Sequence, residues 1–382
     1  MSTSKAPAAC GTTSPNSGAG IVGTVAVVGT GLIGGSLGLA LRRAGLQVRG
    51  YDADAGCLAL AVARGAVDHA ASSLLDAYVG ADVAFVAVPV SGVAAAVAAA
   101  LDAGVGAVSD VGSVKAPVVR AVEAQAGGAA ARFVGGHPMA GSGGEEGIEG
   151  ADADLFEGAA WVLTPTGSTD PAAFTAVRDL VALTGAAVMA VDPDLHDELV
   201  AIVSHLPHLA ASALMHLAAD AQPNHETLLR LAAGGFRALT RLSGRSAGIW
   251  PDICVENRAA IVDILDRYMK ELERVRDLVA AAERAPLLDF FEVARAEVSS
   301  LPVRSAGAGP LVELSMPVPD RPGVLAEVTT LAGHQGVNIV DLDISHGPTG
   351  GVLLMVVPAS GADAIVAGLA DLGYHTTRRE VG

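Results

Sequence analysis

The sequence predicts three folded parts in succession: an α/β part with a parallel sheet, an all-helical part and a small βαββαβ part. Short β-branched runs alternate with helical patterns up to residue 191, long helical patterns follow, and strand patterns return after a Pro/Gly/Ala-rich linker. A length of 382 residues also exceeds the usual size of one domain. The predicted boundaries are a disordered tail at 1–19, the α/β domain at 20–191, the helical domain at 192–300, the linker at 301–310 and the last domain at 311–382.

Composition excludes several classes of partner. The formal net charge of −17 argues against binding to nucleic acid or to an anionic membrane, because both need a basic face. Cys10, Cys57 and Cys254 show neither a paired spacing nor a metal-ligand grouping, which is typical of a reducing compartment. The N-terminal residues lack a signal sequence, and no stretch resembles an unbroken membrane span. We therefore expect a cytoplasmic protein.

The first element pair has the order of a dinucleotide-binding unit. A β-branched run at 25–28 leads into the glycines of a G-x-G-x-x-G turn, then into a helical pattern, a second strand at 48–51 and finally Asp52. Glycines allow the tight turn, and the helix N-terminus provides free N–H groups for a pyrophosphate. A carboxylate at this point accepts hydrogen bonds from ribose hydroxyls and repels a 2′-phosphate, which favours NAD, although Arg49 and Arg64 lie close in the sequence. These features predict a Rossmann domain that binds NAD through Gly29, Gly31, Gly34 and Asp52.

Further strands at 81–90, 106–115, 132–138, 159–165 and 185–193 alternate with helical patterns at 91–104 and 171–184. The alternation predicts a parallel sheet with right-handed crossovers, in which ligands bind at the carboxyl ends of the strands. Pro89, Ser113 and His137 fall at such ends. His137 lies among glycines after a strand, which favours a functional histidine over one that only caps a carbonyl group. Ser113 has an alternative role as the N-cap of the following helix.

Two polar groupings mark the helical domain. Ser204 and His208 are four residues apart, so a helix places them on one stripe, with His205 less certain; the alternative is a polar seam between packed helices. No carboxylate lies at ligand spacing on that stripe, so we expect no metal. Arg237 and Arg241 are also four apart, and two guanidinium groups on one face suit a dianionic substrate better than they suit a solvated surface.

The segment 251–286 carries apolar residues at helical spacing for more than thirty residues. Such a length exceeds that of an ordinary globular helix. Its apolar stripe is broad enough to pack within the domain and against a second copy, which predicts a homodimer. The residues of the stripe are Ile253, Ala260, Ile264, Tyr268, Leu272, Val275 and Val279.

Four motifs together resemble the prephenate/arogenate dehydrogenase family: DVGSVK at 110–115, GGHPMAGS at 135–142, SHLPH at 204–208 and GGFRALTRLSG at 234–244, over about residues 22–290. The resemblance implies NAD-dependent oxidative decarboxylation of prephenate to 4-hydroxyphenylpyruvate and CO2 in tyrosine biosynthesis. It also implies that His137 accepts the proton of the ring hydroxyl and that Ser113 orients this hydroxyl. By the same resemblance Arg241, Arg237, His208, Ser204 and Trp250 bind substrate, and Leu32, Ile33 and Pro89 join the glycines at the cofactor.

Two departures from the family keep the substrate open. Family members often carry an acid shortly after the HPMAG motif and an Asp after the first arginine of the pair, whereas this chain has Gly143 and Ala238, with Glu145 and Glu146 as substitutes. The alternatives are therefore an arogenate dehydrogenase and a dual-specificity cyclohexadienyl dehydrogenase. A silent nucleotide-binding regulator is a further alternative, although it would not need Ser113, His137 and Arg241 together.

The last domain, 311–382, reads strand, helix, strand, strand, helix and a strand ending near Thr377. With the motif DRPGVLAEV at 320–328 it resembles an ACT domain, a ferredoxin-like module that binds amino acids. The resemblance implies an effector site for an aromatic amino acid, with a module that only dimerises as the alternative. Its expected residues are Asp320, Gly323 and Val324 at the turn and Asn338 and Ile339 on a facing strand.

Overall fold

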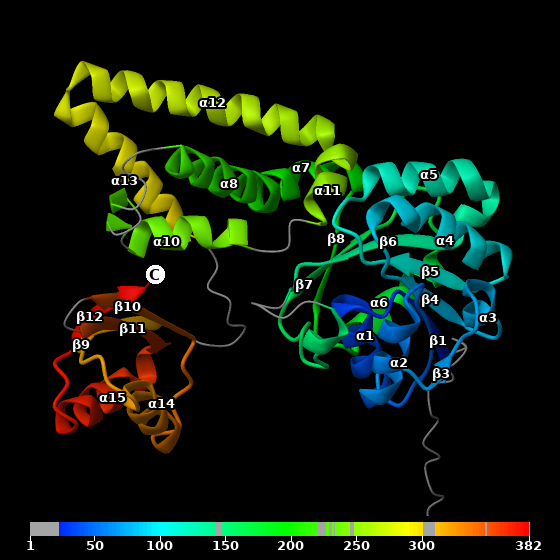
Figure 1. The fold of residues 1–382 in the computed structure, drawn as a ribbon, viewed down its shortest axis with the longest axis horizontal. Coiled ribbons are helices and arrows are strands. Elements are labelled where there is room, and N and C mark those ends of the chain that lie inside the picture. The colour runs from blue at the N-terminus through cyan, green and yellow to red at the C-terminus, as the bar shows by residue number, and fades with distance from the viewer. Residues whose placement is uncertain are drawn as a thin grey trace, which may run out of the picture.

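A computed structural model shows the fold (Figure 1). It describes residues 23–141, 147–220, 227–228, 231–232, 234–244, 248–300, 310–347 and 350–381. The predicted tail at 1–19 and the linker up to residue 309 lie outside the described residues.

The first domain is built on an eight-stranded sheet in the order β3-β2-β1-β4-β5-β6-β7-β8. Strands β3 to β6 are parallel, as predicted, but β7 pairs with β6 in the antiparallel direction, so the expectation of an all-parallel sheet is wrong. A parallel return needs a crossover helix, and the described part of the link between β6 and β7 holds only a 3-10 turn, Ile148–Gly150. The strands are β1 (Thr24–Val28), β2 (Gln47–Tyr51), β3 (His69–Ala70), β4 (Val83–Val86), β5 (Ala107–Asp110), β6 (Phe133–Pro138), β7 (Ala160–Thr164) and β8 (Ala187–Ala190).

Helices cover both faces of this sheet, as Figure 1 shows. The two faces have separate cores because neighbouring residues of a strand point to opposite sides. Val25 and Val27 of β1 pack with α1, α2 and α6, while Ala26 and Val28 pack with α3, α4 and α5. The helices are α1 (Leu32–Arg43), α2 (Ala55–Ala63), α3 (Leu74–Tyr78), α4 (Val90–Asp102), α5 (Ala116–Ala126) and α6 (Pro171–Ala182).

The second domain is helical, as predicted. The single helix expected over 251–286 is wrong, because the chain leaves helical geometry at Asn257 and again at Ala282, whose φ is +53°. Asn257 is buried and its side-chain amide binds groups of another helix, which explains the first break. The elements are α7 (Pro193–Val200), a π-helical turn (Ala201–His205), α8 (Leu206–Ala219), α10 (Gly234–Thr240), a 3-10 turn (Arg241–Gly244), α11 (Trp250–Glu256), α12 (Arg258–Ala281) and α13 (Arg284–Ser300).

The helical stretch Pro193–Ala219 has the length and apolar composition of a membrane span, which differs from the sequence expectation. Length and composition are weak evidence, because core helices of folded domains share them. This stretch carries the buried side chains of His196, Asp197, His205 and His208. These side chains lie inside the protein, while the apolar 18-residue window as a whole is 28% buried.

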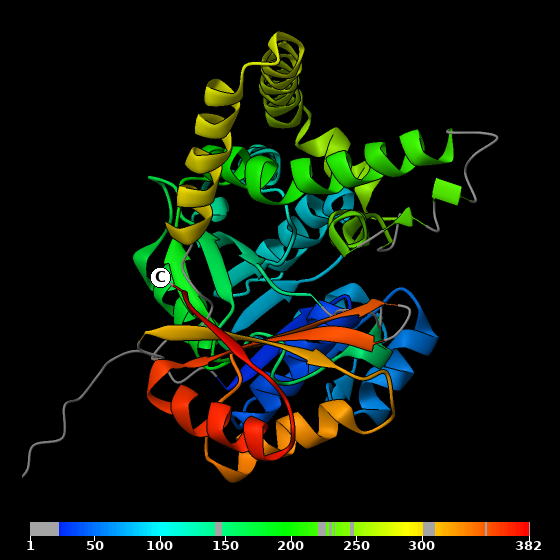
Figure 2. The ribbon, with the colours of Figure 1, turned by 90° about the vertical axis from the view of Figure 1, so that its left-hand side faces the viewer.

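The third domain is a four-stranded antiparallel sheet in the order β10-β11-β9-β12 with two helices on one face (Figures 1 and 2). Its βαββαβ order is the predicted one. The last strand, expected to end near Thr377, instead begins there, and Asn338 and Ile339 precede β10 and do not lie on a strand. The elements are β9 (Leu311–Val318), α14 (Val324–His334), β10 (Asp341–Gly347), β11 (Gly350–Pro358), α15 (Ala359–Asp371) and β12 (Thr377–Val381).

Candidate active site

The glycine turn joins β1 to the N-terminus of α1. Gly29 has a φ of +88°, and a Cβ there would lie 2.3 Å from the carbonyl oxygen of Ala87, so only glycine fits. A Cβ at Gly34 would lie 1.9 Å from the oxygen of Gly29. Gly31, in contrast, has no atom within 4 Å of its Cβ position and caps α1 without a side-chain hydrogen bond. The turn therefore leaves the first N–H groups of α1, which begins with Leu32 and Ile33, facing open space.

Asp52 lies beside this turn, directly after β2. Its Oδ2 accepts hydrogen bonds from the backbone N–H of Thr30 at 2.7 Å and from the Thr30 hydroxyl at 3.1 Å, and its Oδ1 accepts from the N–H of Asp54. These contacts hold the carboxylate next to the glycines. Pro89 lies at the end of the neighbouring strand β4, where it is the N-cap of α4.

His137 lies on β6 and begins a chain of polar contacts. Its Nδ1 is 2.9 Å from Nε2 of His196, and the Nδ1 of His196 is 2.8 Å from Oδ1 of Asp197. The Asp197 carboxylate also accepts hydrogen bonds from the backbone N–H groups of Lys115 at 2.8 Å and Ala116 at 2.9 Å. Asp197 thus caps α5 from another helix and at the same time orients His196.

These contacts assign the protons of both imidazoles. An ionised carboxylate only accepts, so His196 carries its proton on Nδ1 and accepts at Nε2 from the Nδ1–H of His137. The Nε2 of His137 then holds a free lone pair. Burial lowers the pKa of His137 well below 6.5, and the nearby His196, Lys115 and His205 lower it further. His137 is therefore a neutral base at neutral pH.

His196 and Asp197 were not predicted as site residues from the sequence. A usable signal was present, because His196 lies eight residues before Ser204, two helical steps of four, on the same predicted stripe. The π-helical turn then adds a residue and shifts the buried stripe, so that His205 is buried and Ser204 is only half-buried. His205, treated as the less certain residue, is the one that faces the protein interior.

Trp250 covers the histidines of this stripe. Its ring stacks on His208 with centroids 3.5 Å apart and an interplanar angle of 11°, and it meets His205 edge-on at 6.2 Å. Trp250 is the first residue of α11 and contacts histidines of the same chain. Val90 and Val114 of the first domain pack in the same apolar cluster as Ile253 and Ile261, so the two domains meet here.

Ser113 lies between β5 and α5, two residues before Lys115. Its alternative role as the N-cap of the following helix is wrong, because Lys115 is the N-cap of α5 and Asp197 accepts from the first N–H groups. The predicted hydroxyl-orienting role of Ser113 stays a prediction.

The two predicted arginines occupy different elements. Arg237 lies in α10 and donates from Nε to the carbonyl oxygen of Ala232 at 3.1 Å, whereas Arg241 begins the 3-10 turn, so one continuous α-helix does not carry both. Both side chains are exposed, and neither forms an ion pair with a described residue. Both elements pack against α8, which also carries His208. Ala238 is exposed, whereas Gly143, Glu145 and Glu146 lie outside the described residues.

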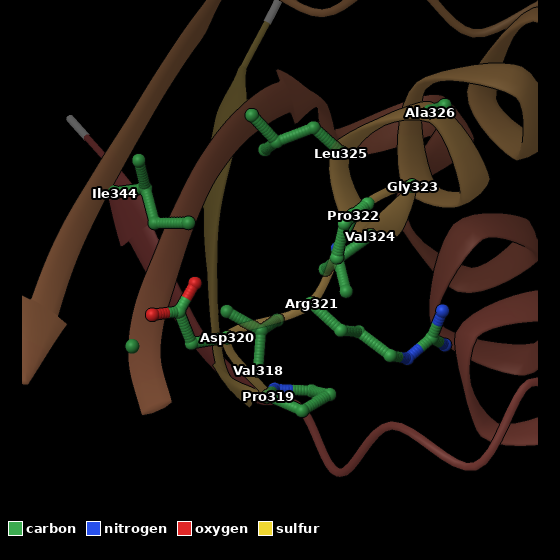
Figure 3. A pocket seen from close by; sticks show the side chains of 11 residues that line it. Val318, Pro319, Asp320, Arg321, Pro322, Gly323, Val324, Leu325, Ala326 and Ile344 are labelled. Atoms are coloured by element: carbon green, nitrogen blue, oxygen red, sulfur yellow. The ribbon is translucent and has the colours of Figure 1, made fainter. Parts of the chain in front are cut away.

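The third domain has a cavity of about 290 Å³ at the turn between β9 and α14 (Figure 3). Asp320, Gly323 and Val324 line it, as predicted, and Gly323 has the expected left-handed backbone with a φ of +93°. The facing wall is formed by Ile344 and Gly351. Asn338 and Ile339 do not line this cavity and do not lie on a strand, and their role at an effector site stays a prediction.

Models of known protein families match the first two domains of this chain. The family model "prephenate dehydrogenase, nucleotide-binding domain" matches residues 37–190, and the model "prephenate dehydrogenase, dimerization domain" matches residues 192–293. A prephenate dehydrogenase of Bacillus subtilis is 32% identical over 327 residues, which cover 84% of this chain and 88% of that protein. This chain belongs to the prephenate dehydrogenase family.

Solved structures of the family have the same fold. The prephenate dehydrogenase of A. aeolicus, in complex with hydroxyphenyl propionate and NAD+, is 29% identical with a TM-score of 0.67, covering 72% of this chain and 97% of that chain. The arogenate dehydrogenase of Synechocystis is also 29% identical, with a TM-score of 0.64, covering 72% and 98%. The family therefore accounts for the Rossmann and helical domains of this chain.

Proposed function

We propose that this chain is an NAD-dependent prephenate dehydrogenase, which converts prephenate to 4-hydroxyphenylpyruvate and CO2. One observation carries the proposal: His137, held by His196 and Asp197, presents an unprotonated Nε2 at the edge of the sheet where ligands bind in this fold. The family match and the relatives named above support it.

The residues of the glycine turn fit NAD. The uncapped N-terminus of α1 and the open space above Gly31 suit a pyrophosphate, and Asp52 has acceptor capacity for ribose hydroxyls. Arg49 is engaged by Asp76, which leaves the Asp52 carboxylate to repel a 2′-phosphate. When bound, NAD accepts a hydride from C4 of the substrate ring. The residues that would hold it are Gly29, Gly31, Leu32, Ile33, Gly34, Asp52 and Pro89.

The remaining steps belong to the protein. As C4 loses its hydride, His137 takes the hydroxyl proton on Nε2, and Ser113 orients that hydroxyl. The new positive charge on His137 is stabilised through its Nδ1–H contact to His196, which Asp197 holds in the required tautomer. The ring carboxylate leaves as CO2, its bonding electrons complete the aromatic ring, and His137 returns the proton to the phenolate oxygen. Aromatisation supplies the driving force.

Substrate recognition falls to the helical domain. Prephenate carries two carboxylates, and we assign Arg241 to one of them with support from Arg237. Ser204 and His208 contact the side chain, and Trp250 covers the ring. The stacking of Trp250 on His208 supports this arrangement, because it places both rings on the same wall.

The second candidate is arogenate dehydrogenation, alone or with dual specificity. The similarity to the Synechocystis arogenate dehydrogenase favours considering it, and Gly143 and Ala238 in place of family acids leave the substrate open. Purified protein is offered prephenate and arogenate in turn with NAD, and reduced cofactor is followed by absorbance. We expect turnover of prephenate. Turnover of arogenate alone would refute the first candidate, and turnover of neither would refute both.

We also propose that the chain is a cytoplasmic homodimer regulated by an aromatic amino acid. Support for the dimer comes from the matched dimerization domain and from the apolar stripe of α12, where Leu272 is 49% and Val279 is 61% exposed. Support for regulation comes from the βαββαβ topology and the cavity beside Asp320, which has an apolar wall suited to an aromatic ring (Figure 3). We identify this domain as an ACT domain on that basis.

A further inference from the structure

A fully buried ion pair lies beneath β6, the strand that carries His137. The Lys115 Nζ pairs with Oδ2 of Asp110, and both side chains are 0% exposed. The same ammonium group donates to the carbonyl oxygen of Gly136 at 2.8 Å, while Oδ1 of Asp110 accepts from the N–H of Gly136 at 3.0 Å. One ion pair therefore binds both polar groups of the residue that precedes His137.

The position of this pair is informative because the sheet ladder ends just before it. β5 pairs with β6 at Val108 with Phe133 and at Ser109 with Val134, and no further backbone pairing follows. Continuing this register would pair Asp110 with Gly135 and then Val111 with Gly136. The N–H of Gly136 donates to the Asp110 side chain, and its carbonyl oxygen accepts from the Lys115 side chain. These two side chains take the place of the backbone groups that a longer β5 would have provided.

Lys115 also reaches the second histidine. Its backbone N–H donates to Oδ1 of Asp197, the atom that orients His196. The side chain of Lys115 thus fixes the strand of His137, and its backbone fixes the partner of His196. The two attachments thus lie on either side of the 2.9 Å contact between the two imidazoles.

A side chain at Gly136 would break this arrangement. Its Cβ would lie 2.5 Å from the carbonyl oxygen of Asp110 and 2.8 Å from Oγ of Ser109. β6 therefore approaches the end of β5 as closely as glycine alone permits. A buried ion pair is weak evidence for stability by itself, since burial costs both charges their hydration. The geometry of the Asp110–Lys115 pair is better explained by its hydrogen bonds to the backbone of Gly136.

We propose that Asp110 and Lys115 are positioning residues for the proposed dehydrogenation, which hold Gly136 so that His137 meets His196 in the reactive geometry. The proposal rests on the function proposed above. The charged and titratable groups that face His137 are Lys115 and Asp110 beneath β6, His196 and Asp197 of α7 and His205 of the π-helical turn. Lys115 is a positive charge near His137, so it also disfavours protonation of that imidazole.

The test uses a variant that removes both charges together, Asp110→Asn with Lys115→Met, so that no single buried charge is left unpaired. We expect kcat to fall by about 10²-fold while the KM for prephenate and the Kd for NAD change little, because misplacement of a catalytic group by about 1 Å has effects of this size. The acid limb of the pH profile of kcat should move to higher pH, since the variant removes Lys115, which lowers the pKa of His137, whereas Asp110 is not among the groups that shift this pKa.

The matched control is Arg120→Met. Arg120 pairs with Asp194 and so also joins α5 to α7, but both side chains are more than 60% exposed. This variant should keep kcat and the acid limb of the wild type. NMR titration of histidine side chains in the cofactor-free protein, with His137 assigned from His137→Asn, gives a readout that needs no turnover; the pKa of His137 should rise in the double variant.

The outcomes separate the two proposals. If wild-type protein oxidises neither prephenate nor arogenate, the proposed function fails, whatever the variants do. If wild-type protein is active and a folded double variant matches its kcat and its acid limb, the positioning role is overturned. If the double variant does not fold, Asp110→Leu with Lys115→Met, an apolar pair that also leaves no single buried charge, takes its place under the same criteria. An unchanged pKa of His137 in a folded variant without the charge would equally contradict the inference.

Discussion

At the residue scale, the neighbours of His137 decide which of its nitrogen atoms can react. Asp197 sets the tautomer of His196, and His196 in turn leaves Nε2 of His137 as the ring nitrogen with a free lone pair among the four of these two imidazoles. The arrangement resembles a general base with an orienting partner, extended by one imidazole. A neutral imidazole suits this task because a protonated one could not accept a second proton.

Replacing His137 by Asn should therefore lower kcat by about 10²-fold or more while the Kd for NAD stays the same. The glycine turn that binds the cofactor does not depend on His137. Steady-state kinetics and fluorescence titration with NAD measure the two quantities. His216→Asn, an exposed histidine of α8, is the control and should behave as wild type. Full turnover in the His137 variant would show that His137 does not take part in the reaction.

His205 makes a separate prediction about stability. The Asn257 amide donates to the carbonyl oxygen of Asp197 and lies 3.2 Å from Nδ1 of His205, so a donor already faces that nitrogen. Burial lowers the pKa of His205 to about 4. Because the unfolded chain takes up this proton near pH 6.5, stability contributed by neutral His205 is complete above pH 6.5 and is lost as the pH falls toward 4.

At pH 5 this linkage costs about 2 kcal/mol relative to pH 7.5. The His205→Gln variant lacks the titrating group, so its free energy of unfolding should fall less over the same range. Urea unfolding of both proteins at the two pH values measures the difference. Equal losses in the two proteins would show that His205 does not cause the acid sensitivity.

At the element scale, two glycines of the turn are expected to have different roles, Gly31 in cofactor binding and Gly34 in packing. Gly34 is required by packing, since its Cβ would lie 1.9 Å from a backbone oxygen, whereas Gly31 borders open space. Gly31→Ala should keep the wild-type Tm and weaken NAD binding at least about tenfold, because the methyl group occupies the approach of the pyrophosphate. Gly34→Ala should lower the Tm instead. Equal Tm losses in both variants would contradict this division.

The helix α12 has a buried apolar part and an exposed apolar part. Its N-terminal part buries Ile261 and Ile264 within the chain, while Leu272 and Val279 further along remain exposed. Placing Glu at both exposed positions should shift the protein from dimer to monomer, because a carboxylate is costly to bury in an apolar interface. Sedimentation velocity measures the state, and Lys270→Glu, a change outside the apolar stripe, serves as control. A dimer of unchanged stability would place the interface elsewhere.

At the scale of the whole molecule, the last domain has a core of its own, whereas the first two domains share an apolar cluster. The apolar core of the last domain contains only residues from 312 to 374, and the cores around the site contain none of them. A chain ending at residue 300 should therefore fold and keep its turnover. In a thermal-shift panel with Tyr, Phe and Trp, the full chain should be stabilised by at least one of them and the shortened chain by none. Stabilisation of the shortened chain would move the effector site out of the last domain.

Local features of the sequence determined much of this protein. The glycine turn with Asp52, the place of His137 at the end of a strand, the helical second domain and the βαββαβ order all follow from patterns within about 30 residues, because turns, strand faces and helix stripes depend on neighbouring residues. Those patterns also carry the family motifs, which the comparisons confirm.

Tertiary structure alone decided what lies between these segments. The direction of β7, the break at Asn257, the burial of His205 in place of Ser204 and the attachment of Asp197 to α5 all depend on packing between distant parts of the chain. The bond from Lys115 to Asp197 joins residues 82 apart in sequence. No local pattern specifies such a contact, because it forms only when the helical domain packs against the edge of the sheet. That packing turns a histidine at a strand end into a base with a defined free nitrogen.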